Sequence, residues 1–220
     1  MVEKQLAARR VDLGKRLVPY QEGWDLQRQV HEEVVGRETP PTLLFLEHQA
    51  TFTAGKRTQP EDRPADGVEV IEVDRGGRIT WHGPGQLVCY PIVPLGQPFD
   101  VVAHVRRLET AIMRTCADYD ISTEQVAGRS GVWCASTNPA CKIAAIGVRV
   151  ARGVTMHGLA LNVDCDLSWS QRIVPCGIPD ASVTSMAQET GRDFNVSVVS
   201  DSLERHLREV LEPTLSANAA

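Results

Sequence analysis

The sequence predicts an α/β (α+β) domain in which a mixed central β-sheet is flanked by a few helices. Runs of apolar, β-branched residues outnumber the segments with helical periodicity, and the two kinds of segment do not strictly alternate along the chain. No internal repeat or linker divides the 220 residues, and a chain of this length can bury a full core as one domain. We therefore expect residues 1–220 to form a single domain, with flexible ends at about 1–10 and 214–220.

The first part of the chain predicts a strand, a helix and a second strand. Residues 9–14 (RRVDLG) read as a short strand. Residues 20–35 carry apolar side chains near helical spacing, and Gly36 can end this helix as a C-cap. The apolar run at 42–48 (TLLFLEH) predicts a strand. The segment 49–67 is polar and rich in Gly and Pro, and long loops of this kind are commonly functional or mobile.

The middle of the chain predicts three more strands and a helix. Strands are expected at 68–73, 87–93 and 130–134. Asp100 is a good N-cap for a helix whose apolar positions, from 101 to 119, form one amphipathic stripe. Such a helix is expected to lay its apolar stripe on the sheet.

The last part of the chain predicts two long strands and a final helix. Residues 142–150 (KIAAIGVRV) are almost continuously apolar, as expected for a strand buried on both faces, and 154–163 (VTMHGLALNV) form the next strand. Leucine and valine residues spaced by four predict a helix near 198–211, which Pro213 should stop.

Charge and composition exclude several classes of protein. A net charge of −5 argues against a nucleic-acid binder, which would usually be basic. No apolar run approaches the roughly 18 residues that span a bilayer, and the first residues lack the apolar core of a signal peptide. The six cysteines show no CxxC pair, so neither a zinc ribbon nor a disulfide framework is indicated. We expect a cytoplasmic protein with reduced thiols and no metal or cofactor.

A glycine-rich segment, RGGRITWHGPGQ at 75–86, is the first stretch that could carry chemistry. Its four glycines allow a backbone to approach a ligand closely. It is neither a P-loop nor a dinucleotide-binding fingerprint, because no GK[ST] follows and no GxGxxG opens a helix. A glycine-rich hairpin with solvated arginines explains the composition equally well, and His82 could be a structural histidine.

Lys142 and Cys176 form the second candidate. Lys142 opens an apolar strand, where an unpaired ammonium group costs several kcal/mol to bury. Cys176 lies in PCGI, where Pro175 and Gly177 favour a tight turn that can expose a thiol to substrate. Taken singly, a cysteine is more often a small buried hydrophobe and a lysine at a strand end more often reaches for solvent. We hypothesise that the two side chains meet and carry out acyl transfer.

Five segments together identify a resemblance to a known family. In chain order they are RGGRITWHGPGQLVCYP, GVW, KIAAIGVRV, HGLALNV and IVPCGI. With them the chain closely resembles the octanoyltransferases of lipoate synthesis, which resemble the biotin and lipoate protein ligases in their catalytic fold. The match runs from about Tyr20 to the TSM segment near 184–186. The departures are mild, because Trp81 stands where tyrosine is common and Arg78 is at a variable position.

This resemblance implies a mechanism and a set of site residues. The family's nucleophile matches Cys176, and the lysine paired with it matches Lys142. A lysine ammonium stabilises a thiolate, which would take octanoyl from acyl carrier protein and pass it to a lysine amine. The implied substrate pocket consists of Arg75, Gly76, Gly77, Arg78, Ile79, Thr80, Trp81, His82, Ala145, Ile146, Gly147, Gly158, Leu159 and Ala160, with His48 and Tyr20 as further pocket candidates. Oxyanion donors are expected near Gly77, Gly147 or Gly177.

The resemblance also implies the partners. The donor would be octanoyl-acyl carrier protein, and the acceptors would be lipoyl domains of 2-oxoacid dehydrogenases and the glycine cleavage H protein. We expect a monomer. Because these partners are usually acidic, docking on a net negative chain needs a local basic patch. The candidates are the pairs Arg149 with Arg152, Arg106 with Arg107, and Arg9 with Arg10, with scattered solvated arginines as the equal alternative.

Four other readings compete with this one. An ATP-dependent lipoate–protein ligase would need no cysteine nucleophile. An amidotransferase that moves octanoyl between carrier domains also uses a cysteine, but the chain lacks its pattern. A non-catalytic acyl-binding protein would not need Lys142 and Cys176. A metal site made of His82, His157 and Cys176 has the residue types but no recognisable ligand spacing.

Overall fold

The protein is built around one large mixed β-sheet. The computed structural model describes residues 5–135, 141–173 and 182–217. Seven strands follow the order β1-β2-β6-β10-β9-β8-β7, and β11 pairs with β9 beside this path. These strands are β1 (Ala7–Arg10), β2 (Thr42–Leu46), β6 (Gln86–Ile92), β7 (Thr123–Val126), β8 (Arg129–Cys134), β9 (Cys141–Ala151), β10 (Val154–Asn162) and β11 (Ser182–Val183). The pairs β1–β2 and β9–β11 are parallel and the other pairs antiparallel, which confirms the predicted mixed sheet.

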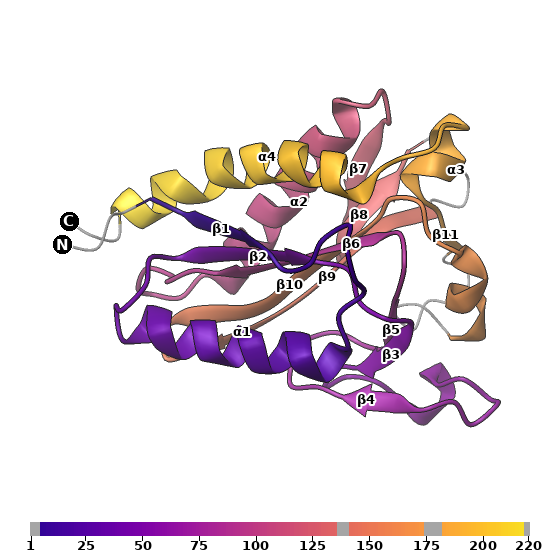
Figure 1. Cartoon of the computed structure of the whole chain (residues 1–220), viewed down its shortest axis with the longest axis horizontal. Coiled ribbons are helices and arrows are strands. Elements are labelled where there is room, and N and C mark those ends of the chain that lie inside the picture. Colours follow the sequence, from indigo (N-terminus) through magenta and orange to yellow (C-terminus); the bar gives the residue numbers. More distant parts are fainter. Residues whose placement is uncertain (1–4, 136–140, 174–181, 218–220) are drawn as a thin grey trace.

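A second, smaller sheet lies at one end of the molecule (Figure 1). It consists of β3 (Thr51–Ala54), β4 (Val70–Glu72) and β5 (Thr80–His82), in the order β4-β3-β5. Two 3₁₀ helices, η1 (Pro60–Asp62) and η2 (Leu167–Arg172), belong to the connections. Phe52 of β3 and Trp81 of β5 are buried in the small core of this unit.

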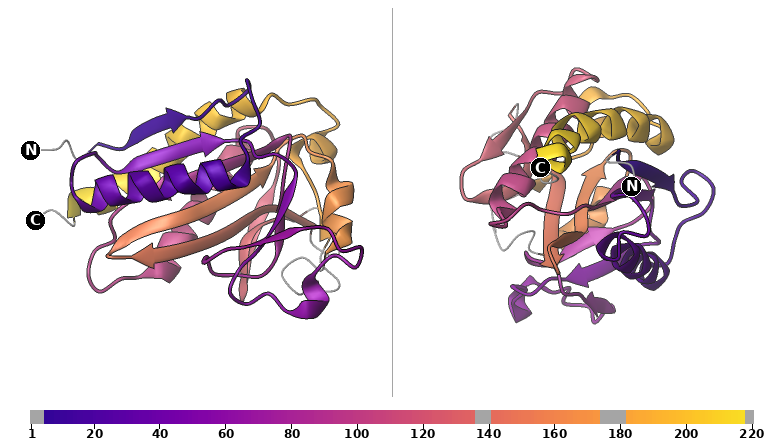
Figure 2. Two further views of the ribbon diagram at one scale, coloured as in Figure 1. Left: turned by 60° about the horizontal axis from the view of Figure 1, so that its bottom comes forward. Right: turned by 90° about the vertical axis from the view of Figure 1, so that its left-hand side faces the viewer.

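Helices cover both faces of the large sheet, as Figures 1 and 2 show. On one face, α1 (Tyr20–Val35) packs Val30 and Val34 against Leu44 and Leu46 of β2. On the other face, α2 (Val101–Ala117) and α4 (Val196–Ala217) enclose the main core, and the short α3 (Met186–Thr190) precedes α4. Each fully buried leucine or valine stabilises the fold by about 1.5–3 kcal/mol, so these apolar stripes fix the helices on the sheet.

The two long helices of the first half confirm the sequence patterns. α1 has the predicted bounds, and Gly36 is its C-cap residue. α2 begins after Asp100, whose side chain accepts a hydrogen bond from the backbone N–H of Ala103. The predicted strands at 42–48, 87–93, 130–134, 142–150 and 154–163 correspond to β2, β6, β8, β9 and β10.

Several expectations about the ends and the long loop are wrong. The segment 49–67 contains β3 and η1. The first strand lies at Ala7–Arg10 rather than 9–14, and the chain turns at Asp12, whose φ is 51°. Pro213 lies inside α4, and residues 214–217 continue the helix. A proline inside a helix costs about 3 kcal/mol, but Leu211 and Leu215 beside it are buried in the core and offset that cost.

The burial of some single residues depends on tertiary packing. His31, His104 and His206 lie on α1, α2 and α4 and are all buried, as is Cys134. Cys165 is only partly buried. In the described part of the chain, no helix has the length and apolar character to cross a membrane.

Candidate active site

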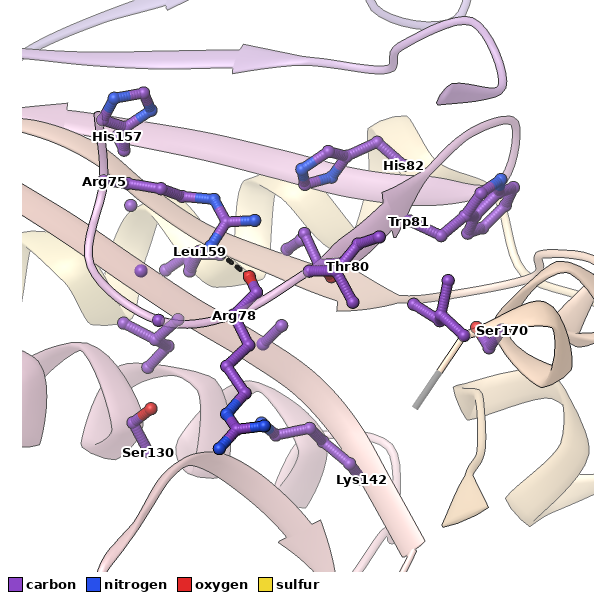
Figure 3. Close-up of a pocket in the computed structure, with 18 of the residues that line it drawn as sticks. Arg75, Arg78, Thr80, Trp81, His82, Ser130, Lys142, His157, Leu159 and Ser170 are labelled. Carbon is purple, nitrogen blue, oxygen red and sulfur yellow. Dashed lines mark hydrogen bonds between the residues drawn. The ribbon is translucent and has the colours of Figure 1, made fainter. Parts of the chain in front are cut away.

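A cavity of about 590 Å³ opens between the large and the small sheet (Figure 3). β5, β6, β9 and β10 supply its walls, and the loops at 56–59 and 75–79 and the start of β8 contribute to its lining. The expected site residues that line it are Tyr20, Arg75, Gly77, Arg78, Ile79, Thr80, Trp81, His82, Lys142, Ala145, Ile146, Gly147, Gly158, Leu159 and Ala160. Gly76 and His48 are not among the lining residues. Cys176 and Gly177 lie outside the described residues.

Arg75 holds the glycine-rich loop in shape. Its side chain is 7% exposed. One terminal nitrogen donates to the carbonyls of Gly76 and Arg78, at 3.0 and 2.8 Å. The other donates to the carbonyl and the hydroxyl of Thr53, both at 2.9 Å. A buried guanidinium with this many carbonyl acceptors is a structural centre, so the segment is not a hairpin of solvated arginines.

Glycines let this loop lie close against β9. A Cβ at Gly147 would come within 3.0 Å of the Gly76 carbonyl oxygen and 3.1 Å of the Cδ of Arg75. The loop is also bonded to β9, because the Gly76 N–H donates to the carbonyl of Val148 at 3.0 Å. Any side chain at Gly147 would push the loop away from the cavity wall.

Lys142 is the second residue of β9 and is 5% exposed. Its ammonium nitrogen lies 5.0 Å from the ring centroid of Trp133, a cation–π distance. Its backbone carbonyl accepts from the N–H of Thr184, at 3.0 Å. The lysine predicted at the mouth of a strand is therefore buried, and Figure 3 shows it at the same side of the cavity as Arg78.

A chain of hydrogen bonds fixes the orientation of His82. The carbonyl of Thr184 can only accept, so the Asn162 amide donates to it at 2.9 Å. The Asn162 oxygen then accepts from the Gln86 amide nitrogen, also at 2.9 Å. This leaves the Gln86 oxygen to accept from Nδ1 of His82 at 2.8 Å. His82 Nδ1 therefore carries the proton and Nε2 has the lone pair.

Burial keeps His82 neutral. Loss of solvent, together with the nearby His48 and Arg75, holds the pKa of His82 well below its ordinary value of 6.5. The ring of Tyr20 stacks on it with centroids 5.9 Å apart and an interplanar angle of 17°. A neutral imidazole of fixed tautomer can accept a proton or a hydrogen bond through Nε2.

His48 supports this wall from behind through Tyr90, which lines the cavity. His48 Nδ1 donates to the carbonyl of Val18 at 3.0 Å, so its Nε2 accepts from the Tyr90 hydroxyl at 2.7 Å. Burial lowers the pKa of His48 to about 4. His48 is fully buried and lies 4.9 Å from the Tyr20 ring, which separates its role from that of a lining residue.

His157 occupies a strained position beside the cavity. Its φ is 57°, which is rare for a residue with a side chain. Its backbone N–H donates to the side-chain oxygen of Gln27, and its Nε2 donates to Asp74 at 2.8 Å. Asp74 also pairs with Arg149. Burial and the neighbouring arginines lower the pKa of His157 to about 3.

The described residues offer no metal site. No group of three His, Cys, Asp or Glu side chains within them is arranged to hold a metal ion. Instead, one ring nitrogen of His82 is hydrogen-bonded to Gln86, and one ring nitrogen of His157 is hydrogen-bonded to Asp74. The lysine, the neutral histidine and the apolar wall suit a group-transfer reaction on a substrate with an apolar part.

Sequence reasoning missed several lining residues. Gln86 and Asn162 lie inside the motifs that carry the family resemblance. Gln86 begins the apolar strand β6 and Asn162 is the last residue of the apolar strand β10, and a polar residue at such a position could have indicated a role in the site. Lys56 and Arg57 line the cavity from the loop after β3 and Arg129 lines it from the start of β8, and nothing in their local sequence marks them.

Comparison with known proteins gives a consistent set of relatives. The sequence pattern of the lipoyl protein ligase A/B catalytic domain matches residues 19–208. The octanoyltransferase of Salinispora tropica is 55% identical over 196 residues, which cover 88% of this chain and 92% of that protein. The octanoyltransferase of Thermobifida fusca is 56% identical over 205 residues, covering 90% and 87%.

Two solved structures with a similar fold are ligases. A bipartite lipoate protein ligase from Thermoplasma acidophilum has a TM-score of 0.68 at 15% identity, covering 96% of this chain and 84% of that one. A biotin protein ligase from Aquifex aeolicus has a TM-score of 0.53 at 13% identity, covering 98% and 72%. At these identities the likeness concerns the fold, and it agrees with the fold that the sequence motifs imply.

Proposed function

The chain belongs to the family of lipoyl protein ligase A/B catalytic domains, and from this premise we propose that it transfers an octanoyl group from acyl carrier protein to a lysine of a lipoyl domain. It is an acyltransferase, because relatives more than half identical over most of both chains are octanoyltransferases. This close identity is the observation that carries the proposal. The finer steps rest on residues of the site.

In the first half-reaction the thiolate of Cys176 attacks the carbonyl carbon of the donor thioester. The tetrahedral intermediate collapses, the carbon–sulfur bond to the carrier breaks, and the carrier leaves as a thiol after taking a proton from the Lys142 ammonium, which leaves the Lys142 amine neutral for the second half-reaction. The buried ammonium of Lys142 stabilises the attacking thiolate, which raises the fraction of nucleophile at neutral pH.

In the second half-reaction the ε-amine of the acceptor lysine attacks the acyl-cysteine. An amide bond forms, the bond to Cys176 breaks, and Lys142 accepts the proton that the amine loses. Exchange between thioesters is nearly isoenergetic and amide formation runs downhill, so no ATP is required. The same covalent intermediate predicts ping-pong kinetics.

The cavity has a region suited to the acyl chain. Ile146, Leu159 and Ile173 supply apolar walls, and Ala145 and Ala160 leave room between them. Burial of an alkyl chain against such a wall contributes about 0.8 kcal/mol per CH₂ group. His82 is suited to position the thioester or the lysine at the polar side.

Intact-protein mass spectrometry tests this proposal. The enzyme is mixed with octanoyl-acyl carrier protein without an acceptor, and a gain of one octanoyl group is expected. The adduct should map to Cys176 and disappear when a lipoyl domain is added. Cys141→Ser is the matched control, because it removes a half-buried thiol next to Lys142 and should leave the adduct intact.

Two outcomes contradict parts of the proposal. Transfer without any adduct would favour direct attack by the acceptor lysine and leave Cys176 without a covalent role. Transfer from free octanoate that depends on ATP would instead indicate a ligase, as the structural relatives are named.

A further inference from the structure

The cavity carries a strong concentration of positive charge. Six cationic side chains line it, namely Lys56, Arg57, Arg75, Arg78, Arg129 and Lys142. Of the described residues that line it, none is an aspartate or a glutamate. The chain as a whole has a net charge of −5, so the charge at this opening is opposite in sign to that of the protein.

Three of these cations differ from the others by their exposure and surroundings. Arg75 is held by backbone carbonyls, Arg78 pairs with Asp62 at 3.0 Å, and Lys142 is buried. Lys56 and Arg57, in contrast, are exposed, and Arg129 is half-buried. Among the described residues, no carboxylate forms an ion pair with Lys56, Arg57 or Arg129. We call these three residues the cationic rim.

The rim is assembled from two distant parts of the sequence. Lys56 and Arg57 follow β3, where their backbone N–H groups donate to the carbonyls of Arg75 and Gly77 at 3.1 and 3.0 Å. Arg129 opens β8, and its guanidinium lies 5.6 Å from the ring centroid of Trp133. The ammonium group of Lys142 lies over the same Trp133 ring. Arg129 of the rim and Lys142 are therefore both positioned by Trp133.

Five of the six arginines in the basic pairs expected from the sequence form ion pairs. Arg149 pairs with Asp74 and Arg152 with Glu32. Arg106 pairs with the buried Glu109, and Arg9 and Arg10 pair with Glu33 and Asp201. An arginine beside a carboxylate presents little net field to a partner, so these five suit docking less well than the cationic rim does.

We propose that the cationic rim of Lys56, Arg57 and Arg129 is the docking surface for an acidic protein whose acyl-bearing arm enters the cavity. This inference rests on the proposed function and names where its protein partner binds. At physiological ionic strength, charges are screened beyond about 8 Å. The net negative charge of the whole chain is therefore weakly felt at the opening, and the local rim decides attraction.

The rim favours a protein over a neutral small thioester. Exposed charges at the edge of an interface mainly raise the association rate and make it sensitive to salt, while the acyl chain itself is recognised in the apolar part of the cavity. A neutral thioester gains nothing from the rim. The ratio of kcat/KM for the protein donor to kcat/KM for a neutral donor therefore isolates docking from chemistry.

The test compares charge reversals at the rim with a matched reversal elsewhere. The variants are Lys56→Glu/Arg57→Glu and, separately, Arg129→Glu. The control is Lys15→Glu/Arg37→Glu, which changes the net charge equally at two exposed residues that do not line the cavity. Acyl-enzyme formation is measured with octanoyl-acyl carrier protein, with octanoyl-coenzyme A and with the octanoyl thioester of N-acetylcysteamine.

We expect the protein-to-neutral ratio to fall about tenfold in the double rim variant at low ionic strength, less in Arg129→Glu, and to stay unchanged in the control. The salt dependence of the protein reaction should weaken in the rim variants. An unchanged ratio in either rim variant, or an equal fall in the control, overturns the docking surface. An equal loss of kcat/KM with octanoyl-coenzyme A would overturn the proposal, because it would show that the rim binds the phosphate groups of the donor and not an acidic protein.

Failure of the proposed function is distinguishable. A wild type that takes octanoyl from none of the three donors overturns the acyl-enzyme mechanism, and the docking surface with it. A wild type that reacts with all three, while the rim variants keep its ratio, overturns the docking surface alone.

Discussion

Gly131 lies directly against the side chain of Lys142. A Cβ at Gly131 would come within 2.6 Å of Cε and 3.2 Å of Nζ of that lysine, and within 2.4 Å of the carbonyl oxygen of Ala144. The φ of Gly131 is +106°, a conformation that side chains rarely adopt. Its N–H donates at 3.0 Å to Glu109, whose carboxylate is fully buried. The lysine therefore runs over a position that only glycine can occupy.

Gly131→Ala should displace Lys142. The added methyl group conflicts with the Cε atom and with a strand carbonyl, so we expect acyl-enzyme formation to slow at least tenfold, with strain of about 1–3 kcal/mol. The rate is measured by rapid-quench mass spectrometry and the stability by denaturant unfolding. Gly67→Ala is the control, because its φ is also positive, at +73°, but a Cβ there meets nothing within 4 Å and Gly67 does not line the cavity. Equal rate losses in both variants would assign the effect to backbone strain.

Lys142→Met should separate catalysis from stability. Methionine has a similar length and no charge, so the variant removes the desolvation cost of a buried ammonium group. We expect the free energy of unfolding to be unchanged or higher, while turnover falls by about 10²–10⁴, the usual contribution of a positioned acid or base. Parallel denaturant titrations and steady-state assays check this. A large loss of stability with little loss of turnover would make Lys142 a structural residue.

Asn162→Ala should loosen the tautomer of His82. Its removal leaves one of the two N–H groups of the Gln86 amide without its acceptor at 2.9 Å, and a buried unpaired donor costs about 1–3 kcal/mol. The longer bond to the Trp81 carbonyl, at 3.2 Å, is then the one that still orients the Gln86 amide, so the preference of His82 for a proton on Nδ1 should weaken. We expect ¹⁵N chemical shifts of His82 to indicate a mixture of tautomers, together with a lower kcat.

A control of similar stability tests that reading. Asn195→Ala removes an exposed side chain that accepts from the Ser197 N–H at 2.8 Å, near the start of α4. Loss of such a bond costs about 1 kcal/mol, but it should leave both the His82 shifts and kcat unchanged. If kcat falls equally in the two variants, general destabilisation is the cause.

The sequence predicts the secondary structure well where the spacing of apolar residues is regular. α1 and α2 follow from apolar stripes with clear caps, at Gly36 and at Asp100. β3 was missed because its four residues stand among glycines and prolines and gain their stability only from pairing with β4 and β5. Pro213 was misread because local propensity favours a stop, whereas burial of Leu211 and Leu215 extends the helix.

The site shows the same division between local and tertiary information. Most of the residues expected at the site line one cavity, because they belong to strands and loops that face it. The hydrogen-bond chain from Thr184 to His82 links residues about a hundred positions apart, so no local pattern contains it. The burial of His31 is likewise tertiary, since its Nε2 lies 3.0 Å from the carbonyl oxygen of Ala151.

Acid should destabilise the protein through its buried histidines. The pKa of His48 is lowered to about 4 and that of His157 to about 3, while unfolded histidines titrate near 6.5. Below pH 6.5 these histidines bind protons in the unfolded state but stay neutral in the folded state. Their contribution to the free energy of unfolding is therefore fully present above pH 6.5 and is lost as the pH falls towards 4. A shift of this size at His48 corresponds to about 3 kcal/mol. Denaturant unfolding at pH 7.5, 6 and 5 should reveal this slope, and His48→Asn, which can keep a donor for the Val18 carbonyl, should reduce it by up to one proton. An identical slope in the variant would mean that His48 does not contribute to the acid sensitivity.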